Sequence, residues 1–237
     1  MLGGEIMLDN NLLKYAYIRG YMIKNDIKIN NQILSKDLNE LNNEDFILLD
    51  QVAKEYNLKL YYFKEKENLP RVNIVLGFLK GNDFTKILDI GSGRGVFLFP
   101  LLKEINNIEV TSMEILDKRV ELLNYISLGG VKNLKVIKED ITMSKISNDS
   151  YEVITMLEVL EHIPNVFDAI KNAIRISKKF IIVTVPSKED NNPEHIHLLT
   201  KDKLTKMFNE NGVYNLKFGG VNGHLYLIAR KGDVDDW

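Results

Sequence analysis

Residues Lys86 to Gly95 read KILDIGSGRG, a short apolar strand that ends in an acid and is followed by three glycines at alternate positions. Glycine is needed where the backbone takes a positive φ or where a ligand approaches the main chain closely. Gly91, Gly93 and Gly95 supply such positions in a single turn. The segment from about Val96 to Asn106 has the pattern of a helix whose free N–H groups would point back at the ligand. The stretch therefore predicts a turn that binds a nucleotide cofactor.

The chain after this turn alternates between strands rich in Val, Ile and Leu and segments of helical periodicity. This alternation predicts an α/β fold of the Rossmann-like, doubly wound class, with a mostly parallel seven-stranded sheet covered by helices on both faces. The segments 214–221 and 224–231 predict a C-terminal antiparallel hairpin. Four residues are expected at helix ends, with Asp117 and Thr200 as N-caps and Gly129 and Gly212 as stops.

The beginning of the chain follows a different pattern and predicts an N-terminal helical extension, residues 1–69, ahead of a cofactor-binding domain at residues 70–232. Helical periodicity is present in the extension at 11–25 and 44–57. The charged segment from Lys64 to Pro70, which ends in proline, is the expected linker.

Composition limits the classes of protein to which this chain can belong. Its 237 residues carry 31 basic and 33 acidic side chains, so the net charge of -2 gives no reason to expect tight binding to nucleic acid or membranes. It has no cysteine, hence neither disulfides nor thiolate metal sites. The longest apolar runs, such as 180–183, are too short to cross a bilayer, and the start lacks a cationic apolar signal segment. We therefore expect a cytoplasmic protein with no membrane partner.

Polar residues follow five successive strands of the predicted sheet, and ligands bind beyond the carboxyl ends of the strands in such a sheet. They are Asp89 with the glycines, Glu114, Asp140, the segment 158–162 and the segment 186–197. One or two acids there would be ordinary, but five successive polar strand ends are what a cleft for a cofactor and a substrate requires. Glu114 in particular can accept hydrogen bonds from both hydroxyls of a ribose.

The run D-I-G-S-G-R-G at 89–95, the acid Glu114 and the E-D-I of Glu139 to Ile141 together resemble the class I S-adenosylmethionine-dependent methyltransferases. The resemblance covers roughly Arg71 to Lys231. The glycine spacing departs from the G-x-G-x-x-G of dehydrogenases, which leaves a nicotinamide enzyme as the least favoured alternative.

This resemblance implies S-adenosyl-L-methionine as the cofactor and gives a role to each matching residue. It assigns the amino-acid end of the cofactor to Asp89, Gly91, Gly93 and Gly95, the ribose to Glu114, and the adenine to Asp140 and Ile141, and it counts Glu158 among the cofactor residues. From the residues alone, Asp140 is explained equally well as an acid in the turn that follows a strand.

A second group of functional residues follows the fourth strand in the segment LEVLEHIPN. Glu158, Glu161 and His162 stand at i, i+3 and i+4, so on a helical turn they would share one face. Two carboxylates and an imidazole suit a divalent metal such as Mg or Mn. An extended segment would separate the two carboxylates and form no such site. His195 and His197 follow the fifth strand, which the predicted topology places beside the fourth.

These segments resemble two branches of the family. L-E-V-L-E-H followed by E-H-I-H-L-L-T is similar to the ubiquinone-biosynthesis O-methyltransferases and their type 11 relatives, which act on small molecules. E-x-x-E-H with a later histidine is similar to the metal-dependent 2′-O-methyltransferases of small-RNA 3′ ends. The second match implies a metal bound by Glu158, Glu161, His162 and His195. It ranks second because Ile196 to Leu199 replace the aromatic segment expected after the late histidine. In the wider family the E-H pair mainly shapes the wall beneath the methionine moiety.

An oxygen acceptor must lose a proton when it is methylated. Either an imidazole accepts that proton, with His162 and His195 as the catalytic candidates, or a metal lowers the pKa of the acceptor. We therefore expect a methyltransferase that acts on a hydroxyl or amine of a small-molecule acceptor. The alternatives are a metal-dependent RNA 3′-terminal ribose 2′-O-methyltransferase and a non-catalytic cofactor-binding subunit. No oligomeric state is predicted.

The aromatic residues of the N-terminal extension leave two interpretations open. Tyr17 and Tyr21 stand at helical spacing, which favours packing against a neighbouring element. The alternative is a lid that selects the acceptor. A lid predicts that deletion up to Leu69 leaves cofactor affinity nearly intact and abolishes turnover, and equal loss of both would refute it.

Overall fold

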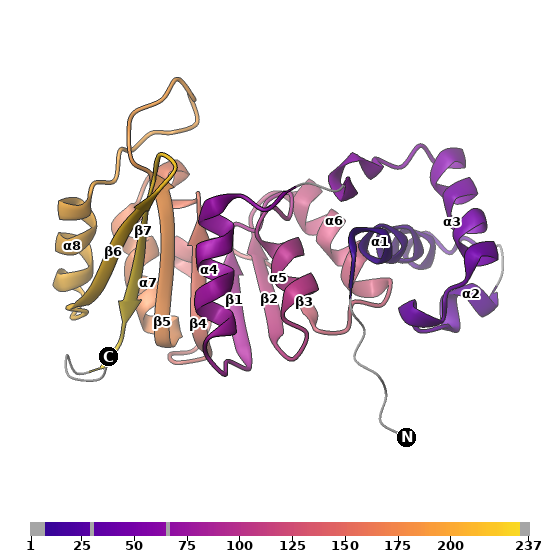
Figure 1. Ribbon diagram of the computed structural model, residues 1–237, viewed down its shortest axis with the longest axis horizontal. Helices are drawn as coiled ribbons and strands as arrows, with labels where there is room; N and C mark the ends of the chain where they lie inside the picture. The colour runs from indigo at the N-terminus through magenta and orange to yellow at the C-terminus, as the bar shows by residue number, and fades with distance from the viewer. Residues whose placement is uncertain (1–7, 29–30, 65–66, 233–237) are drawn as a thin grey trace.

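The structure, a computed structural model, describes residues 8–28, 31–64 and 67–232. In this part of the chain seven strands form one sheet in the order β3-β2-β1-β4-β5-β7-β6, seen edge to edge in Figure 1. The strands are β1 Lys86–Ile90, β2 Glu109–Glu114, β3 Leu134–Lys138, β4 Tyr151–Leu157, β5 Ser177–Pro186, β6 Asn215–Val221 and β7 His224–Arg230. The first five pair in parallel, whereas β7 pairs antiparallel with both β5 and β6. The predicted fold class, including the C-terminal hairpin, is confirmed.

Each face of the sheet buries its own apolar cluster because successive side chains of a strand point to opposite faces. In β1, Ile87 belongs to the cluster beneath α4, α5 and α6, and Leu88 and Ile90 belong to the cluster beneath α7 and α8. These helices span Pro70–Lys80, Leu98–Glu104, Asp117–Leu128, Val166–Ile176 and Lys201–Glu210, in that order. The central strands are therefore covered on both faces, which fixes where their carboxyl ends open to solvent.

Helix α5 is shorter than the sequence pattern predicts, because it begins at Leu98 rather than near Val96. Pro100 explains the difference. A helix that started at Val96 would need a hydrogen bond from the nitrogen of Pro100 to the carbonyl of Val96, and proline has no N–H. Starting at Leu98 leaves Pro100 in the first turn, where that donor is not required. The glycine turn and α5 are thus separate features, and the expected helix N-terminus does not directly follow Gly95.

The helix ends agree with three of the four expectations. Thr200 is the N-cap of α8, where its side chain accepts a hydrogen bond from the N–H of Lys203 at 3.3 Å. Gly129 is the C-cap of α6, and Gly212 follows α8 with a φ of 78°. Asp117 is different, since it is the first residue of α6 and Leu116 occupies the N-cap position. An acid in the first turn still complements the helix dipole.

The N-terminal helices lie beyond the β3 edge of the sheet, and the first of them packs against α6 (Figure 1). They are α1 Asn10–Lys24, α2 Asn31–Ser35 and α3 Asn43–Glu55, with short 3₁₀ helices η1 Leu38–Glu40 and η2 Leu60–Phe63. The short helix α2 was not expected. Helices α1 and α6 approach each other closely at Gly20. A Cβ added there would lie only 1.8 Å from the carbonyl oxygen of Tyr125, so only glycine fits at this position.

Aromatic side chains of α1 contribute to this packing. Tyr17 is buried, and both Tyr17 and Tyr21 pack against the ring of Tyr125. The packing interpretation of these two tyrosines is confirmed. The extension shares one buried cluster with α4 to α6, and two residues of the expected linker, 65–66, lie outside the described residues.

Candidate functional site

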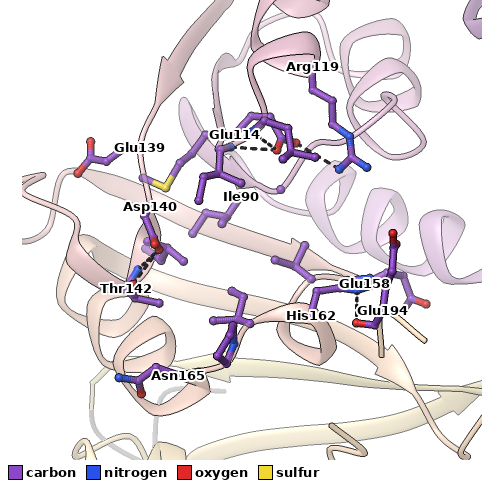
Figure 2. A pocket seen from close by; sticks show the side chains of 18 residues that line it. Ile90, Glu114, Arg119, Glu139, Asp140, Thr142, Glu158, His162, Asn165 and Glu194 are labelled. Carbon is purple, nitrogen blue, oxygen red and sulfur yellow. Dashed lines mark hydrogen bonds and ion pairs between the residues drawn. The ribbon is translucent and has the colours of Figure 1, made fainter. Parts of the chain in front are cut away.

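A cavity of about 550 Å³ opens beyond the carboxyl ends of β1, β2 and β4 and beside the end of β3 (Figure 2). Its walls are Ile90, Gly91, Met113, Glu114, Ile115, Leu116, Arg119, Glu139, Asp140, Ile141, Thr142, Glu158, Val159, His162, Ile163, Pro164, Asn165 and Glu194. Five predicted cofactor residues are among them: Gly91, Glu114, Asp140, Ile141 and Glu158. Three others, Asp89, Gly93 and Gly95, are not among the lining residues. Apolar side chains between the acids suit a nucleoside, whose base is flat and whose ribose carries hydroxyls.

The glycine turn requires glycine for two distinct reasons. Gly91, Gly93 and Gly95 have φ values of 69°, 59° and 79°, in the left-handed region that other residues rarely adopt. A Cβ on Gly91 would also lie 2.6 Å from Cγ2 of Val159, and a Cβ on Gly95 would lie 2.5 Å from the ring of Phe99. The turn is therefore fixed in shape by its neighbours as well as by its own backbone.

Asp89 lies beneath the turn, where it is 2% exposed. Its two carboxylate oxygens accept hydrogen bonds from Ser92 Oγ at 2.5 Å and from Thr155 Oγ1 at 2.7 Å. Ser112 Oγ donates in turn to Ser92 Oγ at 2.7 Å. Burial raises the pKa of Asp89 to about 6, against the two hydrogen bonds, which lower it, and with a small further rise from the charge of Glu114. The buried acid thus ties the turn to β2 and β4.

Glu114 at the end of β2 is bound by the backbone that surrounds it. Its Oε2 accepts from the N–H of Gly93 at 2.9 Å, and its Oε1 accepts from Ile115 at 2.9 Å and Leu116 at 3.3 Å. Nη1 of Arg119 lies 3.8 Å from Oε2 (Figure 2). A carboxylate has about four acceptor positions, so the side chain retains capacity for a hydroxyl in the cavity.

Asp140 follows β3 at the opposite side of the cavity from Glu158. Its Oδ1 accepts from both the N–H and the Oγ1 of Thr142 at 2.8 Å, which caps the 3₁₀ helix η3 at Ile141–Met143. Asp140 therefore has the geometry of an acid in the turn that follows a strand. Both interpretations can hold together, since Asp140 and Ile141 also line the cavity.

Glu158 departs from the expectation that it shares a helical face with Glu161 and His162. The 3₁₀ helix η4 spans only Leu160–His162, and Glu158 precedes it with a φ of 57°. This left-handed conformation turns the side chain to other partners. Thr184 Oγ1 donates to Oε1 at 2.9 Å, His224 Nε2 lies 3.0 Å from Oε2, and Arg71 Nε lies 3.8 Å from Oε1.

The other three residues of the expected metal set do come together. Among the described residues, the ligand atoms of Glu161, His162 and His195 lie within 4.8 Å of one another, and Glu158 is not in the group. Glu161 is 0% exposed, and neither of its carboxylate oxygens has a hydrogen-bond partner among these residues. Burial raises its pKa to about 8. One carboxylate and two imidazoles are a donor set that suits Mn or Zn.

The two histidines differ in their relation to the cavity. His162 lines it, and its Nδ1 lies 2.9 Å from the carbonyl oxygen of Glu194. His195 is not among the lining residues; its ring centroid lies 4.8 Å from that of His162, and its Nδ1 lies 2.9 Å from Asp190 Oδ2. His197 is separate, with its Nε2 3.3 Å from the carbonyl oxygen of Pro164.

Sequence reasoning missed Arg71, Asp190 and His224. His224, the first residue of β7, follows a turn and also contacts Glu158. Its place follows from strand order: β7 pairs with β5, so His224 stands opposite Pro186 at the carboxyl end of β5. Arg71, at the start of α4, is a basic residue next to a proline, a signal too common to indicate a site.

In the described residues no helix combines the length and apolar character needed to cross a bilayer.

Comparisons with known proteins agree with this geometry. A family model described as a methyltransferase domain matches residues 62–217, more than half of the 237 residues. The chain is 28% identical over 130 residues to ribosomal RNA small subunit methyltransferase G of Clostridium perfringens, covering 50% of this chain and 54% of that protein. It is 36% identical over 97 residues to ubiquinone biosynthesis O-methyltransferase of Rickettsia canadensis, covering 40% of this chain and 39% of that protein. The chain thus spans about half or less of these relatives.

The fold is shared with solved structures. A SAM-dependent methyltransferase from Archaeoglobus fulgidus matches with a TM-score of 0.54 and 15% identity, over 68% of this chain and 94% of that one. At this identity the likeness concerns the fold alone. The matched family model, the sheet order and the glycine turn agree with one another. The chain therefore belongs to the class I S-adenosylmethionine-dependent methyltransferase family.

Proposed function

We propose that this protein transfers a methyl group from S-adenosyl-L-methionine to a hydroxyl or amine of a small-molecule acceptor. The observation that carries the proposal is the cavity of about 550 Å³ between the glycine turn and His162. Pockets for small molecules measure roughly 300–1,000 Å³, so this one has room for a nucleoside cofactor and part of a small acceptor.

The nucleoside end of the cofactor would lie between the ends of β2 and β3. Glu114 would accept hydrogen bonds from the ribose, because three backbone N–H groups already hold its carboxylate toward the cavity. Asp140 and Ile141 would flank the adenine. Asp89 would act through Ser92, whose hydroxyl it holds within the turn.

The amino-acid end would lie between the turn and Glu158. An α-amino acid presents a carboxylate and an ammonium, and Arg71 and Glu158 offer the two complementary charges side by side. Nε of Arg71 makes only a loose pair with Glu158 at 3.8 Å, which leaves donors of the guanidinium for a carboxylate.

The bound cofactor supplies a methyl group made electrophilic by its sulfonium. The protein's part is to hold the acceptor in line with that methyl and to receive the acceptor proton. We assign this role to His162, because it lines the cavity and the contact with the carbonyl oxygen of Glu194 involves its Nδ1 rather than its Nε2. His195 would support the ring of His162.

Binding and turnover test the proposal separately. Calorimetric titration with S-adenosylhomocysteine and with NADH, on wild type, Asp89→Ala and Glu114→Ala, identifies the cofactor. Binding of NADH alone would overturn the proposal. Radiolabelled methyl donor is then incubated with cell extract depleted in turn of RNA, protein or small metabolites. Loss of labelling only in the metabolite-depleted extract is expected.

A second candidate is a metal-dependent RNA 3′-terminal ribose 2′-O-methyltransferase. The convergence of Glu161, His162 and His195 favours it, as does the buried carboxylate of Glu161 that has no partner among the described residues. A metal bound there would supply a positive charge close to the acceptor oxygen. Methylation of RNA oligonucleotides that requires Mn or Mg would establish this candidate, and activity that chelators leave unchanged would exclude it.

We also retain the division of the chain into an extension at 1–69 and a catalytic domain at 70–232 as part of the proposal. Helix α4 begins at Pro70 and packs on the sheet cluster beside α5.

A further inference from the structure

The 3₁₀ helix η2 connects the N-terminal extension to the glycine turn. Phe63, its last residue, is only 6% exposed. Its ring stacks on that of Phe99 in α5, with centroids 5.6 Å apart and planes 15° from parallel. Stacked aromatic pairs contribute beyond the area they bury, so this contact fixes the position of both rings.

Phe99 in turn lies directly against Gly95. An added Cβ at Gly95 would meet three atoms of the Phe99 ring at 2.5 to 2.6 Å, so the ring occupies the space where a side chain would stand. The N–H of Phe99 donates to the carbonyl of Gly95 at 2.9 Å, and the N–H of Gly95 donates to the carbonyl of Ser92 at 2.9 Å. Phe63, Phe99 and Gly95 therefore form a continuous path of contacts from the extension to the turn.

The other side of η2 is anchored as well. Phe63 packs on Tyr17 of α1 at 5.5 Å, and Tyr17 packs on Tyr125 of α6 at 5.8 Å. Tyr62 is also close to charged residues of the turn: the hydrogen bond between the hydroxyls of Tyr61 and Tyr62 raises the pKa of Tyr62, and the positive charges of Arg94 and Arg119 oppose that rise. Arg94 belongs to the turn itself, and Arg119 lies beside Glu114. Helix η2 thus contacts α1 on one side and faces the turn on the other.

We propose that Phe63 is a positioning residue for the cofactor, which holds Phe99 against Gly95 and so keeps the glycine turn in its binding conformation. The proposal rests on the proposed function for the identity of the ligand. It makes the extension part of the cofactor site. Deletion up to Leu69 would then weaken cofactor binding together with turnover, in contrast to the expectation for a lid that only selects the acceptor.

The test compares Phe63→Leu with the matched control Phe46→Leu. Phe46 is also an aromatic residue of the extension, and it stacks on Tyr15 at 4.3 Å with planes 15° apart, between α3 and α1. Both changes remove one stacked ring from the extension. Leucine retains most of the apolar volume, so both variants are expected to fold. Phe99→Leu is a second variant on the same path. It tests the path without altering residue 63, so its result does not depend on how the structure around residue 63 responds to substitution.

Two measurements are made on each protein, with the unfolding midpoint recorded beside them. Hydrogen exchange of residues 91–99 reports opening of the turn without any ligand, and calorimetry gives the Kd for S-adenosylhomocysteine. Phe63→Leu and Phe99→Leu are expected to accelerate exchange in this segment and to raise Kd about tenfold, or about 1.4 kcal/mol. Phe46→Leu is expected to lower the unfolding midpoint by a similar amount. It should leave the exchange of residues 91–99 and the Kd unchanged.

Equal effects in Phe63→Leu and Phe46→Leu, or no effect of Phe63→Leu, would overturn the proposal. Wild type that fails to bind S-adenosylhomocysteine would overturn the proposed function instead. In that case the exchange rates of residues 91–99 still decide whether Phe63 holds the turn.

Discussion

Glu158 and His224, which are far apart in the sequence, meet at the carboxyl ends of β4 and β5 with 3.0 Å between Oε2 and Nε2. The other ring nitrogen of His224, Nδ1, lies 3.0 Å from the carbonyl oxygen of Asn222. Both ring nitrogens of His224 thus contact oxygen atoms. Together with Thr184 and Arg71, His224 holds Glu158 in a left-handed conformation that costs energy for any residue with a Cβ.

The first prediction concerns this contact. Glu158→Gln and His224→Asn are each expected to raise the Kd for S-adenosylhomocysteine about tenfold. The first change removes the charge proposed to bind the ammonium of the amino-acid end, and the second removes a contact that orients Glu158. Calorimetry measures the change. Glu152→Gln is the matched control, since Glu152 lies at the other end of β4 and pairs with Lys179 at 2.7 Å. Glu152→Gln should lower the free energy of unfolding and leave the Kd for S-adenosylhomocysteine unchanged. Unchanged Kd in both site variants would contradict the role given to Glu158.

A second prediction follows from the buried carboxyl of Asp89, whose pKa is raised from 3.8 to about 6. Well below pH 3.8 the carboxyl is protonated in both the folded and the unfolded chain. Between pH 4 and 6 the unfolded chain loses the proton first, so the wild type loses stability as the pH rises through this window. At about 1.4 kcal/mol per pKa step, the loss amounts to at most about 3 kcal/mol and stays constant above pH 6.

Asp89→Asn removes this titration. Urea unfolding at pH 4, 5, 6 and 7 is expected to show the variant gaining stability relative to wild type as the pH rises from 4 to 6, with no further gain above. Glu189→Gln, a change at an exposed loop acid, is the control and should run parallel to wild type. A constant difference between Asp89→Asn and wild type across all four pH values would show that the buried carboxyl does not titrate in this window.

The third prediction concerns Glu161, a fully buried carboxyl with no hydrogen-bond partner for either oxygen among the described residues. A buried polar group without a partner costs about 1–3 kcal/mol. In metal-free buffer, Glu161→Met is therefore expected to raise the free energy of unfolding by about that amount, because methionine has a similar shape and no polar atom to desolvate.

Manganese extends this experiment to the second candidate function. If Glu161, His162 and His195 bind the ion, Mn²⁺ raises the melting temperature of wild type and leaves that of Glu161→Met unchanged. His197→Asn is the control, because His197 lies outside the group and should keep the wild-type response. Equal shifts in all three proteins would mean that the ion binds elsewhere, and no shift in any would exclude this site.

Local signals in the sequence were enough for the sheet and the turn. KILDI and the glycines form β1 and its turn as expected, because a short run of buried apolar residues and a positive φ are properties of adjacent residues. Features that depend on residues distant in the sequence could not be predicted from it. The left-handed φ of Glu158 depends on partners from α4, β5 and β7, and the contact of His224 depends on β7 pairing beside β5. The late start of α5 could have been predicted from the sequence, since Pro100 alone explains it.

The last prediction separates backbone strain from steric contact in the glycine turn. Gly95 and Gly212 have nearly equal φ values of 79° and 78°, so replacement by alanine carries a similar conformational cost of about 1 kcal/mol at both. The two sites differ in space: a Cβ at Gly95 meets the ring of Phe99 at 2.5 Å, and a Cβ at Gly212 meets nothing within 4 Å. Gly95→Ala is thus expected to lose about 1–3 kcal/mol more than Gly212→Ala in urea unfolding, the usual cost of overpacking.

Cofactor affinity should show the same asymmetry, with S-adenosylhomocysteine binding weakened at least tenfold in Gly95→Ala and unchanged in Gly212→Ala. Adding Phe99→Leu to Gly95→Ala removes part of the ring that obstructs the new methyl group. The double variant is therefore expected to recover part of the stability lost by Gly95→Ala, which a double-mutant cycle measures directly. Equal losses in Gly95→Ala and Gly212→Ala, with no coupling to Phe99, would mean that φ alone sets the cost and that Phe99 does not constrain the turn.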